Sequence, residues 1–193
     1  MDLTIEPLTP PRWPDLAAVF GERGEASRCW CTYFRMPRPA WSATPPAERR
    51  ALLGGVVAAG REPGLVAYRA GEPVGWVSVA PREEFLPHLE RTRVLKPAPG
   101  DRVWSVLCFV VRPAHRRQGV AAALLRAAVD FARERGAGAV EGHPVDDARR
   151  PVHPMEAYVG VASMFAAAGF TEMDRRGTRP VYRLDLGRPE RTG

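Results

Sequence analysis

The chain has 193 residues, of which 45% are hydrophobic and 26% charged, and its formal net charge is +6. This length favours one domain with a sizeable core, and the composition is ordinary for a soluble globular protein. No apolar stretch approaches the roughly 20 residues that span a bilayer, and the first residues lack the features of a signal peptide. We therefore expect no membrane partner and a cytoplasmic location.

The positive charge does not favour a nucleic acid as partner. Lys96 is the only lysine, and the arginine pairs are scattered along the chain with acidic residues nearby. Aromatic residues that could stack on bases do not alternate with them. Abundant Arg, Ala, Gly and Pro are instead typical of a GC-rich bacterial genome, and a basic surface suits an anionic cofactor.

The first half of the chain predicts helices interrupted by an irregular aromatic segment, followed by a hairpin. Thr44 and the proline after it are typical of a helix start, with Glu48 in the first turn. We expect Ala51, Leu52 and Val56 on one side of that helix. The expected elements are a strand over residues 3–8, a helix over 14–20, a loop or broken helix over 27–41, a helix from 45 to about 60, and hairpin strands over 65–68 and 74–79.

The second half predicts a long connection and then alternating strands and helices. Residues 81–102 form that connection, with a short helix over 83–90; a connection this long is often a lid or a substrate wall. The elements that follow are a strand over residues 104–111, a helix over 118–135, a strand over 139–142, a helix over 156–168, a hairpin over 170–174 and 180–186, and a flexible tail from 187.

Residues 106–121 carry the strongest functional pattern. An apolar strand ending at Val111 meets a proline-containing turn, and a basic segment with Gly119 then opens an amphipathic helix. A strand that turns through a glycine into a helix presents free backbone N–H groups at the positive end of the helix dipole. Phosphate groups bind at such helix starts. The segment therefore predicts a phosphorylated ligand.

The same residues resemble the GCN5-related N-acetyltransferases, the GNAT family. Arg116-x-x-Gly119-x-Ala121 after Val111-Arg112-Pro113 matches the family's pyrophosphate-binding pattern, and residues 163–170 resemble its helix-to-strand corner. The resemblance covers residues 64–186. It implies one α/β domain over residues 1–186, with a mixed, mostly antiparallel central sheet flanked by helices. It also implies an N-acetyltransferase with acetyl-CoA as co-substrate.

The resemblance further implies where acetyl-CoA binds. Its pantetheine arm would pair with the backbone of Phe109, Val110 and Val111, as an added strand does. Its pyrophosphate would lie on N–H groups at the helix start, where Gly119 and Ala121 allow close approach to the backbone. The predicted cofactor-binding residues of this turn are Arg116, Arg117, Gln118, Gly119, Val120, Ala121 and Ala122.

Acetyl transfer to an amine needs a base for the amine's proton, a donor to the thioester oxyanion and an acid for the departing thiolate. The resemblance implies a backbone N–H of the central strand as the donor, and we predict that of Val110. Many family members carry a tyrosine as the acid where this chain has Phe165. Tyr158 is our predicted substitute; packing of the helix is its alternative role, and water could also supply the proton.

For the base we predict Glu141, because an acidic residue in a short apolar strand needs a partner or a task. It would contact the acceptor as well. A structural ion pair is its alternative role, and His143 and Asp146, just beyond it, are further candidates.

An aromatic segment precedes the sheet, with Trp30, Tyr33, Phe34 and Trp41. In acetyltransferases of this shape the region covers the acceptor, so we predict that Trp30, Tyr33 and Phe34 bind substrate; core packing is an equally good explanation. The three cysteines do not form a disulfide framework, and the C-x-C at residues 29–31 is a poor metal pattern, so we expect no metal cofactor.

We expect direct attack on acetyl-CoA by the amine of a small molecule, with a protein or peptide amine as alternative. Two other functions stay open. One is the same fold with another acyl donor: a longer acyl-CoA, a carrier-bound acyl group or an aminoacyl-tRNA. The other is a non-catalytic acyl-CoA-binding module, which Phe165 would suit. Either a monomer or a homodimer is expected.

Overall fold

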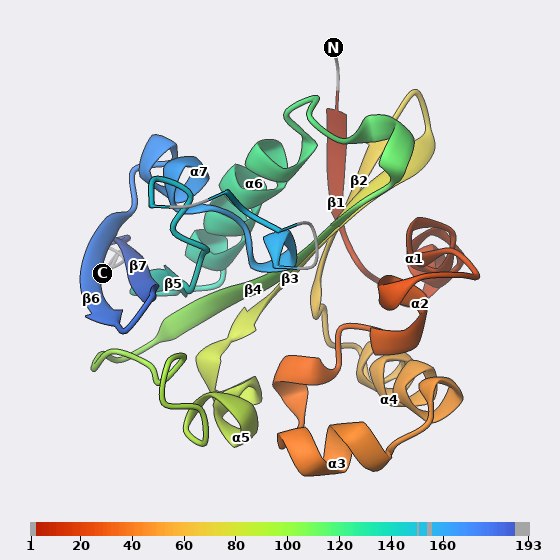
Figure 1. Ribbon diagram of the computed structural model, residues 1–193. Helices are drawn as coiled ribbons and strands as arrows, with labels where there is room; N and C mark the ends of the chain where they lie inside the picture. Colours follow the sequence, from red (N-terminus) through yellow and green to blue (C-terminus); the bar gives the residue numbers. More distant parts are fainter. Residues whose placement is uncertain (1–2, 150, 154–155, 188–193) are drawn as a thin grey trace, which may run out of the picture.

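The computed structural model describes residues 3–149, 151–153 and 156–187 (Figure 1). Their strands form one sheet in the order β1-β2-β3-β4-β5-β7-β6. Neighbouring strands are antiparallel, except that β4 and β5 run parallel, so the expected mixed, mostly antiparallel sheet is confirmed. The strands are β1 (Leu3–Pro7), β2 (Gly64–Arg69), β3 (Glu72–Pro81), β4 (Val103–Val111), β5 (Ala139–Gly142), β6 (Thr171–Arg176) and β7 (Arg179–Asp185).

Helices cover both faces of the sheet (Figure 1). One face packs against α6, with α7 beside it, and the other packs against α1, α2 and the segments that follow them. No helix of the described ranges is long and apolar enough to cross a membrane. The helices are α1 (Trp13–Phe20), α2 (Glu25–Cys29), α3 (Arg38–Ala43), α4 (Pro46–Ala58), α5 (Leu86–Leu89), α6 (Val120–Glu134) and α7 (Ala162–Ala167), and the 3-10 turns are η1 (Pro10–Arg12), η2 (Tyr33–Arg35), η3 (Arg82–Glu84), η4 (Pro113–His115) and η5 (Ala157–Val159).

The amphipathic pattern of α6 fixes its position on the sheet. The apolar residues that recur at three- to four-residue spacing in the sequence are all buried: Val120, Leu124, Leu125, Ala128, Val129 and Ala132. Complete burial of a leucine such as Leu124 contributes about 2 kcal/mol. The helix meets β3 at Gly75, where a Cβ would lie 2.8 Å from Val120 Cγ1. Only a glycine in the strand therefore lets the first turn of α6 approach this closely.

The predicted start of α4 is wrong. The helix begins at Pro46, its cap residue is Pro45, and no side chain caps it. The Thr44 hydroxyl instead donates to the Ala40 carbonyl at 2.8 Å and closes the end of α3. Helices α3 and α4 are only a few residues apart here, and Thr44 caps the end of α3.

The predicted inner face of α4 is also wrong. Leu52 is 48% exposed, whereas Leu53 and Val57 are buried. The helix carries apolar residues at neighbouring positions, so periodicity alone allowed a face rotated by one residue, about 100°. Contact with the rest of the fold decides between the two faces.

The helix expected over residues 156–168 is broken. It consists of η5 and the six-residue α7, separated by Gly160, which has φ = +79°. A Cβ at Gly160 would lie 2.8 Å from Met164 Cε and 2.9 Å from Phe165 Cε2. The chain therefore needs glycine at this bend, and Tyr158 and Phe165 lie on different elements. Of the expected C-terminal tail, only residue 187 lies within the described ranges.

Candidate functional site

Strands β4 and β5 diverge in the middle of the sheet. Their parallel pairing covers Val103–Val106 and ends at Gly142. Strand β4 then continues for five more residues, pairing only with β3. The far side of this part of β4 therefore faces the opening between the two strands, as the sequence analysis expected for the binding of an extended ligand.

The register decides which N–H groups face that opening. The N–H of Arg112 donates to the Val74 carbonyl on β3, at 3.0 Å. Alternate residues of an antiparallel strand direct their N–H groups to the same neighbour. The N–H of Val110 thus also points at β3, whereas those of Phe109 and Val111 point away from it. The predicted oxyanion donor Val110 therefore directs its N–H away from the opening, a direction that does not suit this role.

The turn before α6 has the geometry of an anion-binding helix start. Gly119 caps the helix with φ = +79°, and Arg117 has φ = +58°. The first hydrogen bond of the helix runs from Ala123 N–H to the Gly119 carbonyl at 3.0 Å, so the N–H groups of the preceding helical residues lack partners in the helix. A Cβ at Gly119 would meet nothing within 4 Å. The space above the turn is therefore open to a phosphate group.

The side chains of this turn contact the protein itself. Arg116 Nε donates to the Val111 carbonyl at 3.0 Å. Gln118 accepts a short hydrogen bond from Arg69 and donates to the Ala114 carbonyl at 2.9 Å. The side chain of Val120 is buried in the core. Contact of Gln118 and Val120 with acetyl-CoA would therefore involve their backbone.

Glu141 lies in a buried ion-pair network on the face of the sheet opposite α6. Its side chain is completely buried, and Oε2 lies 2.6 Å from Arg183 Nη2 and 3.8 Å from Arg82 Nη1. Oε1 lies 3.5 Å from Nε2 of the buried His143. Burial by itself would raise the pKa of the Glu141 carboxyl, but His143 and Arg183 outweigh it and hold that pKa below its ordinary value. The ion pair that the sequence analysis left open is thus present.

The aromatic residues fall into two groups. Tyr33 packs against Phe34, Trp41 and His88, with ring centroids 4.4 to 5.2 Å apart. Trp30 instead stacks on Trp13 at 5.6 Å and belongs to the core beneath α1. The structure therefore brings Tyr33, Phe34 and Trp41 together, but does not place Trp30 with them.

Two segments, residues 33–43 and 82–100, cover the face of β4 and β5 on which Glu141 lies; we call them the cover. Arg35 pairs with Glu84, and His88 Nδ1 lies 3.1 Å from the Met36 carbonyl, so the two segments hold each other. Phe34, Phe85 and Leu89 pack with Leu107 of β4. The long connection seen in the sequence thus packs over this face of the sheet.

Tyr158 borders the cover, and Phe165 does not. The Tyr158 ring lies 6.2 Å from that of Phe34, and burial, followed by the nearby Tyr33 phenol, raises the pKa of Tyr158 to about 12. Phe165 is completely buried between β5 and α7, where a Cβ on Gly142 would lie 2.4 Å from its ring. Phe165 is therefore a packing residue in the α6 face of the core.

Cys31 and Cys108 make a contact that the sequence did not indicate. Their sulfur atoms lie 3.2 Å apart, and the Trp76 indole N–H donates to Cys31 Sγ at 3.1 Å. The side-chain contact with Cys31 and burial raise the pKa of the Cys108 thiol well above its ordinary value, so the thiol is a poor nucleophile. Within the described ranges, no group of three or more His, Cys, Asp or Glu side chains is arranged to hold a metal ion.

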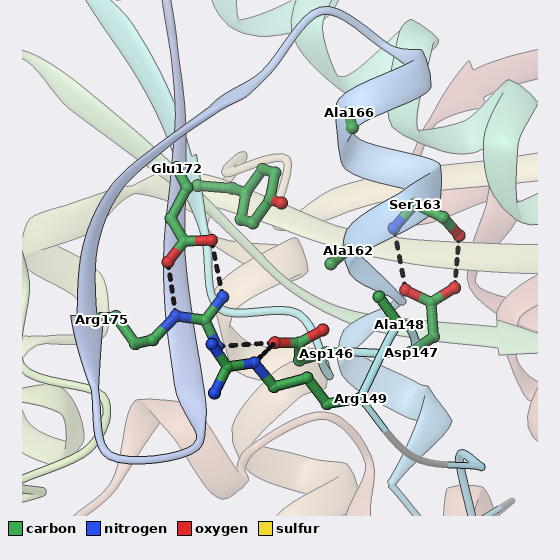
Figure 2. A pocket seen from close by; sticks show the side chains of 10 residues that line it. Asp146, Asp147, Ala148, Arg149, Ala162, Ser163, Ala166, Glu172 and Arg175 are labelled. Atoms are coloured by element: carbon green, nitrogen blue, oxygen red, sulfur yellow. Dashed lines mark hydrogen bonds and ion pairs between the residues drawn. The ribbon is translucent and has the colours of Figure 1, made fainter.

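A cavity of about 420 Å³ lies away from the diverging strands (Figure 2). Residues of α7, β6, β7 and the 146–149 segment line it, and none of β4 or α6 does. Figure 2 shows Arg175 between Asp146 and Glu172, with bonds of 2.6 to 2.7 Å. Asp147 binds Ser163 at the start of α7. The acidic side chains of this cavity are thus already paired with Arg175 or Ser163, and we assign no catalytic role to the cavity.

Comparisons with known proteins agree with this geometry. The model of the acetyltransferase (GNAT) family matches residues 27–155. No curated protein sequence matches the chain. Among solved structures, the PaiA N-acetyltransferase of Thermoplasma acidophilum, in complex with coenzyme A, has a TM-score of 0.56 at 14% identity, with 96% of this chain and 100% of that chain covered. A GCN5-related N-acetyltransferase from Kribbella flavida has a TM-score of 0.56 at 18% identity, with coverage of 95% and 98%. The ribosomal-protein-alanine N-acetyltransferase of Brucella melitensis has a TM-score of 0.54 at 17% identity, with coverage of 95% and 99%.

Proposed function

Because this chain belongs to the acetyltransferase (GNAT) family, we propose that it transfers the acetyl group of acetyl-CoA to the primary amine of a small molecule, by direct attack of the amine. Acetyl-CoA as the donor follows from the family. The acceptor and the roles of individual residues are our proposal.

The cover is the observation that favours a small acceptor. Its two segments hold each other through Arg35 and Glu84, and the aromatic rings of Tyr33 and Phe34 pack against His88 between them. A protein amine at the end of a flexible peptide needs an open groove for several residues. A face of β4 covered from two directions suits a compact molecule better.

The other half of the proposal concerns the donor. The N–H groups at the start of α6 would hold the pyrophosphate of acetyl-CoA, with Arg116 and Arg117 supplying positive charge beside it. The N–H groups of Phe109 and Val111 would face the pantetheine arm and the thioester. Phe109 is closer to the point of divergence, so we assign its N–H to the oxyanion in place of that of Val110.

The experiment begins with calorimetric titration of acetyl-CoA into the protein. Release of the CoA thiol is then followed with a panel of small amines, and with a peptide that begins with alanine as the matched large acceptor. We expect binding, and turnover with at least one small amine that exceeds turnover with the peptide. Absence of acetyl-CoA binding would contradict the donor assignment. Preference for the peptide would contradict the small acceptor.

A second donor series tests acyl specificity. Propionyl-CoA and a longer acyl-CoA replace acetyl-CoA with the best amine of the panel. We expect acetyl-CoA to give the highest kcat/KM, because the buried rings of Phe109 and Phe165 lie 6.4 Å apart beside the opening and leave little room for a longer chain. A faster reaction with a longer acyl group would replace acetyl by that group as the donor.

A further inference from the structure

We infer that His143 accepts the proton of the acceptor amine, and that Glu141 positions its ring. This inference rests on the proposed amine acetylation and assigns a residue to its proton transfer. The sequence favoured Glu141 as the base, with His143 as a further candidate; the structure reverses this preference.

His143 lies where β5 leaves β4. Gly142 is the last residue of β5 paired with β4, opposite Val106, and His143 follows it. Side chains two residues apart in a strand share a face, so His143 projects on the same face as Glu141, the one beneath the cover. On β4, Phe109 lies three residues beyond Val106, at the same opening. The ring and the proposed oxyanion donor thus border one gap in the sheet.

The polar atoms around His143 are buried and incompletely paired. The residue is completely buried, and neither ring nitrogen has a hydrogen-bond partner in the described part of the chain. The same holds for Glu141 Oε1, 3.5 Å from Nε2, and for the hydroxyl of Ser105, the residue opposite Glu141 on β4. An unsatisfied buried polar atom costs about 1–3 kcal/mol. Glu141 Oε1 lies close enough to Nε2 to become the partner of the ring, whereas His143 Nδ1 and the Ser105 hydroxyl have no partner in the described residues; these two indicate a polar ligand or ordered water beside them.

Glu141 is poorly suited to keep the proton itself. Its Oε2 is held by Arg183 at 2.6 Å, with Arg82 at 3.8 Å, and both guanidinium groups favour the ionised carboxylate. Arg183, Arg82 and Glu141 face this region from β7, η3 and β5. A carboxylate so held can instead accept the Nε2–H of His143 and stabilise the ring when it becomes positively charged.

Two protons leave the acceptor nitrogen. The ammonium group first gives one to Nδ1 of His143 through a water molecule, because the ring is buried. The free amine nitrogen then forms a bond to the acetyl carbon while the C–S bond of acetyl-CoA breaks. The second proton of the nitrogen passes to the CoA thiolate through water or through Tyr158, which gives its own proton and takes that one, and His143 returns its proton to solvent when product leaves. No oxidant, metal or further reactant is needed.

The test compares two small nucleophiles that differ in whether they must lose a proton before attack. Ethylamine is mostly an ammonium ion at neutral pH and requires a base, whereas hydroxylamine is mostly unprotonated there. CoA release is measured for the wild type, His143→Gln and His143→Asn, after subtraction of the rate without enzyme. We expect kcat/KM for ethylamine to fall about 100-fold and that for hydroxylamine to change less than about threefold. Equal losses for both nucleophiles would overturn the inference, since a structural role affects them alike.

Two controls separate proton transfer from structure. The exposed His153, changed to Gln, should leave both rates as in the wild type. Glu141→Gln should lower the ethylamine rate about tenfold and the hydroxylamine rate less, as expected of a positioning residue. Raising the pH should restore ethylamine turnover in the His143 variants, because the free amine then no longer needs a base.

A measurement on the wild type does not depend on the folding of the variants. In protein labelled with 15N-histidine and saturated with CoA at pH 8, His143 should carry its proton on Nε2, toward Glu141, with Nδ1 unprotonated. A proton on Nδ1 would overturn the inference. If acetyl-CoA binds but neither nucleophile is acetylated, the proposed function fails and the role of His143 fails with it; if both are acetylated and the proton lies on Nδ1, only the role of His143 fails.

Discussion

At the turn before α6 the groups that would face a ligand belong to the backbone, whereas beneath the cover they are side chains from β4, β5, β7 and the 82–100 segment. The turn is local: a strand, a glycine in a left-handed conformation and a helix follow one another within about twenty residues. The cover region brings together residues that are 101 positions apart, Arg82 and Arg183, around Glu141. The first arrangement tolerates changes in most side chains, and the second depends on each of them.

The largest expected effect tests the turn before α6, where backbone groups would bind the ligand. Gly119→Glu should weaken acetyl-CoA binding about 1,000-fold, or about 4 kcal/mol, because the added carboxylate repels the pyrophosphate and the residue must keep a positive φ. Calorimetry of acetyl-CoA binding measures it. Gly119→Ala is the matched control: its Cβ meets no atom, so only the backbone cost of about 1 kcal/mol remains. Unchanged affinity in the glutamate variant would place the pyrophosphate elsewhere.

The next effect tests the charged side chains beneath the cover. Glu141→Gln should lower the free energy of unfolding by about 3 kcal/mol at pH 7, because Arg183 and Arg82 lose their buried counter-charge. Urea denaturation measures it. Glu62→Gln breaks an ion pair with Arg135 that is about one-third exposed, and should cost less than about 1 kcal/mol.

The difference in unfolding free energy between the wild type and Glu141→Gln should change with pH in a definite direction. The pKa of Glu141 is lowered in the folded state, so its stabilisation is present above the unfolded pKa and is lost as pH falls through the folded pKa. The gap in unfolding free energy between wild type and Glu141→Gln should therefore narrow below about pH 4. A gap that stays constant to lower pH would mean that the charge of Glu141 does not stabilise the fold.

A smaller effect concerns the acid for the thiolate. Tyr158→Phe should reduce kcat about tenfold if the phenol protonates the leaving group. Since burial raises the pKa of Tyr158 to about 12, the wild-type rate should show no loss from its ionisation below about pH 11. Tyr68→Phe, whose hydroxyl binds Asp15 far from β5, is the control and should leave kcat unchanged. An unaltered kcat in Tyr158→Phe would assign the acid to water.

The smallest effect tests whether the cover acts independently of the turn before α6. Arg49 donates to the carbonyls of Arg28 and Trp41, and its guanidinium stacks 3.7 Å from the Trp41 ring. Arg49→Lys loses one of these bonds, at about 1 kcal/mol, and should raise the KM of the best amine about fivefold. The affinity for acetyl-CoA should not change. Arg50→Lys, next to it, is the control, and an effect on acetyl-CoA would show that the cover and the turn are coupled.

Much of the fold could be predicted because its signals are local. The inner face of α6 and the hairpin of β2 and β3 appeared in the sequence as periodicity and as glycine in a turn. The errors fell where neighbouring elements compete. Thr44 could close α3 or open α4, and the apolar residues of α4 allowed two faces, so packing had to choose.

By itself, the sequence determined the turn that opens α6, because a left-handed glycine and free N–H groups follow from a few consecutive residues. It also placed an acidic residue on a buried strand. Only the tertiary structure decided that the Val110 N–H faces β3, since strand register fixes the direction of every backbone donor. It likewise decided that Arg183 and His143 surround Glu141. Ion pairs and strand register depend on residues that are far apart in the sequence, so the order of residues within one strand does not reveal them.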